Sequence, residues 1–69
     1  MNLKPYDPVI VKRDITREEQ LYARKGDAGF ISEIFRPTPT GMREIKTWYA
    51  KVRMAGGVIK TFRLTSLEL

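Results

Sequence analysis

One hairpin near the C-terminus limits the fold more than any other part of the chain. Apolar and polar side chains alternate over residues 44–54, as they do when one face of a strand is buried. The turn Ala55-Gly56-Gly57 follows, built from residues that tolerate positive φ, and residues 58–64 return as a second strand. The side chains expected to point inward are Trp48, Ala50, Val52, Met54, Phe62 and Leu64, and those expected to point outward are Thr47, Tyr49, Lys51, Arg53, Ile59, Thr61 and Arg63.

Two further strands are expected before this hairpin. The first covers residues 8–15, where apolar residues recur at alternate positions. The second covers residues 27–35, and its apolar spacing slips by one residue after Ile31, which predicts a bulge. Residues 36–41 hold two prolines, two threonines and a glycine, so we expect a loop there.

Residues 16–25 leave two structures open. Thr16 and Glu19 match a capping box, in which each side chain bonds the backbone amide of the other residue. Gly26 suits a helix C-cap. These signals favour a short helix over residues 17–25. The alternative is an irregular excursion between two strands, because Leu21 and Tyr22 are the only apolar anchors such a helix would have.

The order of these elements is that of an SH3-like barrel, with a tight turn at Thr65-Ser66-Leu67 and a terminal stub at Glu68-Leu69. A chain of 69 residues buries only about 60% of the surface that its unfolded form exposes, so we expect one domain over residues 1–69. Closing the sheet on itself removes strand edges and suits a chain too short for two packed layers. The expected fold class is all-β, a single small SH3-like antiparallel barrel of about five strands with a short helical turn near the C-terminus.

Few side chains are available for catalysis. The chain has no cysteine and no histidine, which excludes disulfides, thiolate nucleophiles, histidine bases and zinc sites built from these ligands. Its carboxylates have no evident partner, and a barrel of this size is filled by its own side chains. We therefore expect no enzymatic activity and no cofactor. No apolar run approaches the ~20 residues needed to cross a bilayer, and no signal-peptide pattern is evident, so a soluble cytoplasmic protein is expected.

Positive charge is concentrated in one stretch of the chain. The net charge is +5, and residues 42–63 carry six basic side chains against one acidic side chain, whereas residues 1–41 are close to balance. Such a field attracts an acidic partner, whether phosphate backbone, acidic protein or anionic membrane surface. A net charge of this size is also common for solubility alone.

The outward face of the hairpin interleaves aromatic and basic side chains. Tyrosine and arginine are enriched as anchors of protein interfaces, rings and cations together also bind single-stranded nucleic acid, and a solvated sheet face is the third interpretation. We expect a non-enzymatic adaptor that docks an acidic protein partner, with nucleic-acid binding as the alternative and homo-oligomerisation left open. Trp48 is expected to pack in the core. The residues expected to bind the partner are Arg43, Lys46, Tyr49, Lys51, Arg53 and Arg63.

Two segments carry a resemblance to a known group of proteins. Residues 21–35 resemble the central motif of small SH3-like electron-transport accessory proteins, and residues 58–69 resemble their end, in which an aromatic-Arg pair, a turn and a Leu-Glu pair follow one another. This group includes the variable chain of ferredoxin–thioredoxin reductase and accessory subunits of photosynthetic and nitrogenase systems. The resemblance implies a protein without a cofactor of its own that braces a larger redox partner. The same turn glycines and core positions are also similar to those of KOW- and Tudor-like barrels, many of which bind RNA.

Overall fold

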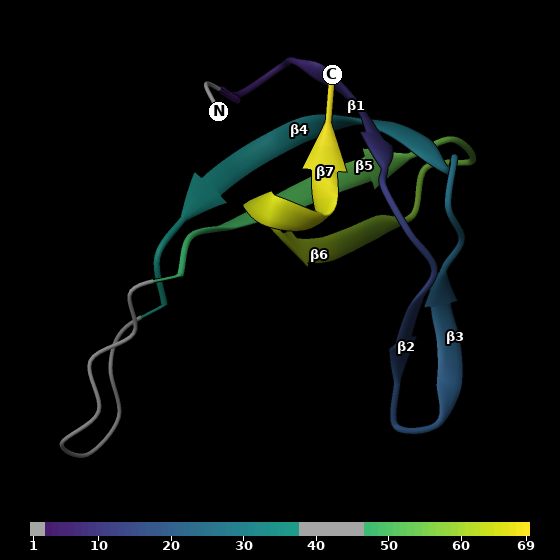
Figure 1. Cartoon of the computed structure of the whole chain (residues 1–69). Coiled ribbons are helices and arrows are strands. Elements are labelled where there is room, and N and C mark those ends of the chain that lie inside the picture. Colours follow the sequence, from purple (N-terminus) through teal and green to yellow (C-terminus); the bar gives the residue numbers. More distant parts are fainter. Residues whose placement is uncertain (1–2, 38–46) are drawn as a thin grey trace, which may run out of the picture.

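A computed structural model describes residues 3–37 and 47–69, and within these residues the chain forms seven strands and one 3₁₀ turn. The elements are β1 Pro8–Val11, β2 Ile15–Arg17, β3 Gln20–Ala23, β4 Ala28–Phe35, β5 Tyr49–Met54, β6 Ile59–Arg63, the 3₁₀ turn η1 Leu64–Ser66 and β7 Leu67–Glu68. Five strands form one antiparallel sheet in the order β6-β5-β4-β1-β7, and the other two pair as a hairpin, β2–β3 (Figure 1). The expected all-β domain with a short helical turn near its C-terminus is confirmed.

β4 is the longest strand and joins the two halves of the sheet. Its residues 28–30 pair with β1, and its residues 29–35 pair with β5. The register with β5 shifts between Ile31 and Glu33, so the bulge predicted after Ile31 is confirmed. A bulge bends its strand and increases the local twist, and β4 accordingly arches across the sheet in Figure 1.

The β5–β6 hairpin forms as the sequence predicts. Gly56 and Gly57 hold its turn at φ of 98° and 92°, and the Met54 N–H donates to the carbonyl oxygen of Val58 at 2.7 Å. Of the predicted inward residues, Leu64 packs against the core while partly exposed, and four are buried: Ala50, Val52, Met54 and Phe62.

The core lies on one face of this sheet and draws on both ends of the chain. Phe62, from β6, is fully buried at its centre, and burial of such a ring contributes roughly 1.5–3 kcal/mol. Leu67 joins it from β7, so this residue belongs to a strand and not to the predicted tight turn. The buried apolar residues are Val9, Val11, Ala23, Ile31, Ala50, Val52, Met54, Phe62 and Leu67.

Trp48 does not pack in the core, and that prediction is wrong. The strand begins one residue later, at Tyr49, and the Trp48 side chain is 46% exposed. Its ring lies beside Arg36, with 5.4 Å between the guanidinium carbon and the ring centroid. Its carbonyl oxygen accepts from the Leu64 N–H at 3.1 Å. The backbone of Trp48 therefore continues the pairing with the C-terminal segment, while its ring belongs to the surface where β4 ends and β5 begins.

Residues 15–23 form the hairpin β2–β3, so the helix over residues 17–25 is wrong. The irregular excursion left open beside it is a β-hairpin whose register shifts between Ile15 and Thr16. Glu18 and Glu19 make its two-residue turn with φ of 52° and 63°, the left-handed region that such turns favour. A helix this short is marginal without tertiary support. The packing of Tyr22 stabilises the strand over the helix, because its ring contacts Phe62 edge-on with 5.6 Å between centroids.

The strand predicted over residues 8–15 ends earlier, at Val11. There the Val11 N–H donates to Asp27 and the Val11 carbonyl accepts from Gly26, at 2.8 and 2.9 Å. These two bonds close the base of the β2–β3 excursion. Residues 12–14 consequently leave the sheet, and the chain enters β2 only after them.

Two further predictions fall partly outside the described residues. Arg36 and Pro37 are irregular, as predicted for the loop over residues 36–41, and residues 38–41 lie outside. The strand predicted from residue 44 starts at Tyr49 within the described part, and residues 44–46 lie outside.

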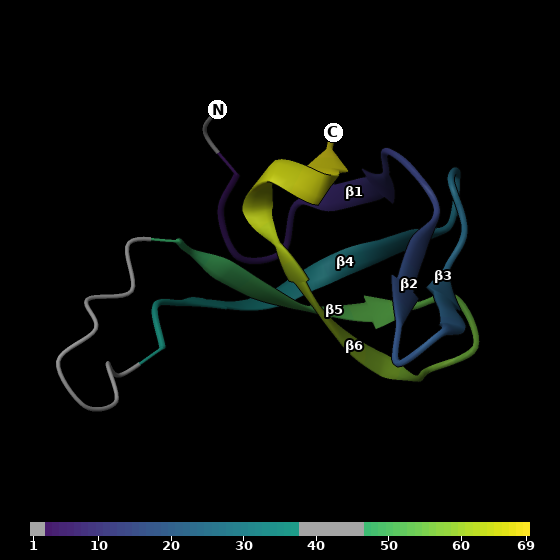
Figure 2. The same cartoon turned by 60° about the horizontal axis from the view of Figure 1, so that its bottom comes forward.

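The sheet is open over the two stretches that the structure describes, with β6 and β7 as its edges. In Figure 2 the C-terminal β7 lies alongside β1, whereas β6 runs beneath β5 on the other side of the sheet. Over the same two stretches no helix has the length and apolar character needed to span a membrane.

Candidate partner-binding site

The surface of β4, β5 and β6 that faces away from the core carries three rows of side chains. Residues directly opposite one another in antiparallel strands are close enough to interact. We call this surface the outer face. Its rows, each from β4 through β5 to β6, are Phe30, Arg53 and Ile59; Glu33, Lys51 and Thr61; and Phe35, Tyr49 and Arg63.

The outer face brings together most of the residues predicted to bind a partner. The expected neighbours across the hairpin are present, since Tyr49 pairs with Arg63 and Arg53 pairs with Ile59. Lys51 lies between these two pairs on β5. The other two predicted residues, Arg43 and Lys46, lie outside the described residues.

Contacts within the outer face partly neutralise one of its cations and stack two of its rings on each other. The rings of Phe35 and Tyr49 stack, with centroids 6.0 Å apart and planes 26° apart. Lys51 is shared between the Phe35 ring, 5.7 Å from its Nζ, and the Glu33 carboxylate at 3.3 Å. Both members of this ion pair are about half exposed, so the pair adds at most about 1 kcal/mol to stability. It is the only ion pair in residues 3–37 and 47–69, which leaves Arg53 and Arg63 as the less neutralised cations of the face.

The row around Arg53 is apolar. Phe30 is 60% exposed and Ile59 is 51% exposed, one on each side of the arginine. A hollow of about 450 Å³ continues this surface over β1 toward Leu69. Exposed apolar side chains around an arginine are typical of protein interfaces.

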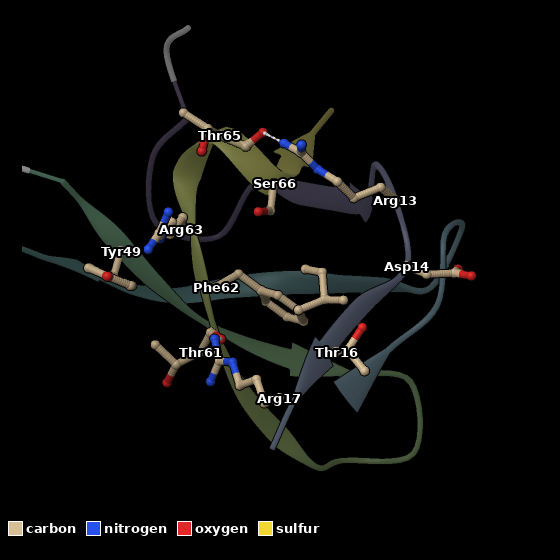
Figure 3. A pocket seen from close by; sticks show the side chains of 11 residues that line it. Arg13, Asp14, Thr16, Arg17, Tyr49, Thr61, Phe62, Arg63, Thr65 and Ser66 are labelled. Carbon is tan, nitrogen blue, oxygen red and sulfur yellow. Dashed lines mark hydrogen bonds between the residues drawn. The ribbon is translucent and has the colours of Figure 1, made fainter. Parts of the chain in front are cut away.

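A groove of about 690 Å³ opens beside Arg63 (Figure 3), a size in the range of ligand-binding clefts. One wall is formed by β6 and η1, and the other by residues 13–17, which comprise β2 and the two residues before it. Tyr49, Thr61 and Arg63 belong both to this groove and to the outer face. We call it the arginine groove, and its lining residues are Arg13, Asp14, Ile15, Thr16, Arg17, Tyr49, Thr61, Phe62, Arg63, Thr65 and Ser66.

The β2–β3 hairpin covers the edge of β6 and so positions Arg17. The Thr61 N–H donates to the Tyr22 hydroxyl at 2.8 Å, and the Thr61 carbonyl oxygen accepts from Arg17 Nη2 at 2.7 Å. The Arg17 guanidinium also lies over the Tyr22 ring, 4.0 Å from its centroid. Lys60 Nζ donates to the Tyr22 carbonyl oxygen at 2.6 Å. These contacts occupy backbone groups that an exposed edge strand would present to other chains.

Arg13 is held at the other end of the groove. Its Nη2 donates to the Thr65 carbonyl oxygen at 3.3 Å, the bond drawn in Figure 3. Arg13 and Arg17 were not among the residues predicted to bind a partner, because they lie in the part of the sequence whose charge is nearly balanced. They reach the site through contacts with residues 52 and 44 positions away, and no pattern in the sequence indicates those contacts.

Guanidinium groups, hydroxyls and aromatic rings dominate both the outer face and the arginine groove. Asp14 is the carboxylate in the groove, and its Oδ1 accepts from the Lys25 N–H at 2.8 Å. In the described part of the chain, no three carboxylates gather closely enough to hold a metal ion.

Fold and site together define a small all-β domain with a cationic groove at the edge of its sheet. No protein-family model, curated protein or solved structure matches the chain. Its function is therefore inferred from its own geometry.

Proposed function

We propose that this protein is a non-enzymatic adaptor that docks an acidic protein partner through the outer face. The observation that carries the proposal is the placement of the predicted basic and aromatic residues on one exposed sheet surface. Arginine and tyrosine are the residues that most often anchor interfaces, whereas lysines mainly raise the association rate and its salt sensitivity. The residues in these roles are Tyr49, Arg53, Arg63 and Lys51.

We also propose that the fold is an SH3-like barrel whose closure is completed by side chains. The strand order, the long excursion after the first strand and the one-turn helix before the last strand support this assignment. The hydrogen bonds of Tyr22 and Arg17 to Thr61 support it further, because they join the excursion to the edge of β6 where a closed sheet would use backbone bonds.

Within this proposal the partner is an acidic redox protein, as the resemblance to electron-transport accessory proteins implies. Ferredoxins and related carriers are acidic, and a chain with a net charge of +5 would steer them toward its basic surface. The adaptor would hold no cofactor of its own, so the iron–sulfur cluster or disulfide would belong to the partner.

Two features of the outer face favour a protein over nucleic acid. The Phe35 and Tyr49 rings stack on each other, which leaves less ring surface for bases. Phe30 is exposed beside Arg53 and adds apolar area, which a protein interface uses.

Affinity capture with matched variants tests the docking proposal. The immobilised protein is exposed to extract of its source cells at low and at moderate salt, and the bound proteins are identified by mass spectrometry. We expect acidic proteins that dissociate as salt rises, and a several-fold loss of capture for the double variant Lys51→Gln/Arg53→Gln. The control is Arg24→Gln/Lys25→Gln, which removes the same charge from exposed positions after β3.

Two results would contradict the proposal. One is capture that is the same for the outer-face variant and the wild type. The other is tight binding of single-stranded RNA or DNA at low salt that weakens steeply with salt and with Tyr49→Ala, which would assign the outer face to nucleic acid.

A further inference from the structure

The three arginines of the arginine groove follow the chain at steps of two residues. The Arg17 guanidinium is bonded to the carbonyl oxygen of Thr61, Arg63 is two residues further along, and the Arg13 guanidinium is bonded to the carbonyl oxygen of Thr65. In Figure 3 they lie in this order along the groove, from Arg17 past Arg63 to Arg13. The anchor points of the three arginines therefore follow one another from β6 into η1, at residues 61, 63 and 65.

These guanidinium groups keep most of their donors for a ligand. A guanidinium has five N–H donors, and the bonds of Arg17 to Thr61 and of Arg13 to Thr65 each use one of them. In residues 3–37 and 47–69 the three arginines form no ion pair. All three side chains belong to exposed residues, so a ligand can reach them without displacing part of the fold.

The charge of the groove selects the ligand. Three guanidinium groups line it against one carboxylate, that of Asp14, which already accepts from a backbone N–H. Arginine forks bind carboxylates with two parallel hydrogen bonds, which fixes orientation as well as charge. The hydroxyls of Thr16 and Ser66 line the same space and add polar contacts for the main chain of a peptide.

We propose that the arginine groove binds an extended acidic segment of the partner protein, with carboxylates on alternate residues that pair with Arg17, Arg63 and Arg13. This inference rests on the proposed function, because it names the part of an acidic partner that the adaptor recognises. A peptide is favoured over a nucleic acid because the groove is continuous with the outer face through Tyr49 and Arg63, where the stacking of Tyr49 on Phe35 leaves less ring surface for bases.

Fluorescence anisotropy with short labelled peptides tests this directly. The first probe has the core Glu-Ser-Glu-Ser-Glu, the second has the same composition as Ser-Glu-Glu-Glu-Ser, and the third replaces each glutamate of the first by glutamine. We expect the alternating acidic peptide to bind most tightly and the glutamine peptide not to bind. Arg13→Gln and Arg17→Gln should each weaken binding of the alternating peptide about fivefold or more, whereas Arg24→Gln should leave it unchanged.

Arg17→Lys separates recognition from folding. The substitution keeps the charge but removes the planar fork, so it should weaken peptide binding while circular dichroism shows the wild-type spectrum. Arg13→Gln provides a second check, because its side chain is exposed and its one bond is long.

Several results would overturn the inference. Equal binding of the two acidic peptides would show that only charge is recognised, and equal loss with Arg24→Gln would show that the groove is not the site. An oligothymidylate that displaces the peptide at equal concentration would assign the groove to phosphate. If the peptides fail to bind but Lys51→Gln/Arg53→Gln still abolishes partner capture, this inference fails and the docking proposal stands. If the peptides bind as expected but Lys51→Gln/Arg53→Gln leaves partner capture unchanged, docking through the outer face fails instead.

Discussion

The hydroxyl of Tyr22 offers a way to measure how the β2–β3 hairpin covers the edge of the sheet. It accepts a hydrogen bond from the Thr61 N–H of β6 at 2.8 Å. The change Tyr22→Phe removes this acceptor and retains the ring, which contacts Phe62 and Arg17. Any loss of stability therefore reports on the hydroxyl and on the backbone donor that it leaves behind.

The expected loss follows from the burial of this bond. A hydrogen bond in a folded protein contributes about 0.5–1.5 kcal/mol net, and a fully buried donor left unpaired costs about 1–3 kcal/mol. The bond between Tyr22 and Thr61 is only partly buried, so water can reach the freed N–H and the lower range applies. We expect a loss of about 1 kcal/mol in the free energy of unfolding, which in a domain of this size lowers Tm by about 4–8 °C.

Urea denaturation followed by far-ultraviolet circular dichroism measures the free energy, and amide hydrogen exchange locates it. Exchange at the Thr61 amide should become faster in Tyr22→Phe, because its hydrogen-bond acceptor is gone. The matched control is Tyr6→Phe, since the Tyr6 side chain is 84% exposed and its substitution should change stability by less than about 0.5 kcal/mol.

The reasoning would be refuted if Tyr22→Phe cost no more than Tyr6→Phe and left exchange at Thr61 unchanged. That outcome would mean that the Tyr22 hydroxyl does not bond the Thr61 amide, so the hairpin would be joined to β6 only by the hydrogen bonds of Arg17 and Lys60.

Three further predictions concern single positions. Gly29→Ala should cost about 1–3 kcal/mol in urea denaturation, because an added Cβ would lie 2.5 Å from a backbone oxygen of β5; an unchanged midpoint would show that β4 and β5 can separate without cost. Glu18→Asn combined with Glu19→Gly should raise the free energy of unfolding by about 1 kcal/mol and raise Tm accordingly, since both residues have positive φ; a lower Tm would argue against the left-handed turn. Glu33→Gln should cost less than about 1 kcal/mol of stability and speed association with an acidic partner in surface plasmon resonance, because Lys51 loses its ion pair; slower association would contradict the docking proposal.

The parts of the fold that the sequence predicted correctly depend on neighbours a few residues apart. The alternation of apolar and polar residues over β5 predicted that Val52 is buried and that Lys51 is exposed, and two adjacent glycines predicted the turn after Met54. The slip in spacing after Ile31 marked the bulge of β4. The same local pattern placed Tyr49, Lys51, Arg53 and Arg63 on one side of the hairpin.

Local signals were misleading where long-range packing competes with them. Thr16 and Glu19 form a capping pattern, yet the chain at Tyr22 is a strand because the ring of Tyr22 packs on Phe62 and its hydroxyl bonds β6. Trp48 fits the alternation of apolar residues in the sequence, but the strand β5 begins only after it, at Tyr49, and its ring is exposed.

By itself the sequence determined an all-β chain, the C-terminal hairpin and the basic outer face of that hairpin, because side-chain alternation and glycine turns act over a few residues. Only the tertiary structure decided that residues 15–23 form a hairpin over the β6 edge and that Arg13 and Arg17 join Arg63 in one groove. Those contacts join residues 44 and 52 positions apart. These contacts hydrogen-bond the backbone groups at the open edge of β6 and pack Tyr22 against Phe62. The edge and the Phe62 side chain are in position only once the sheet has formed.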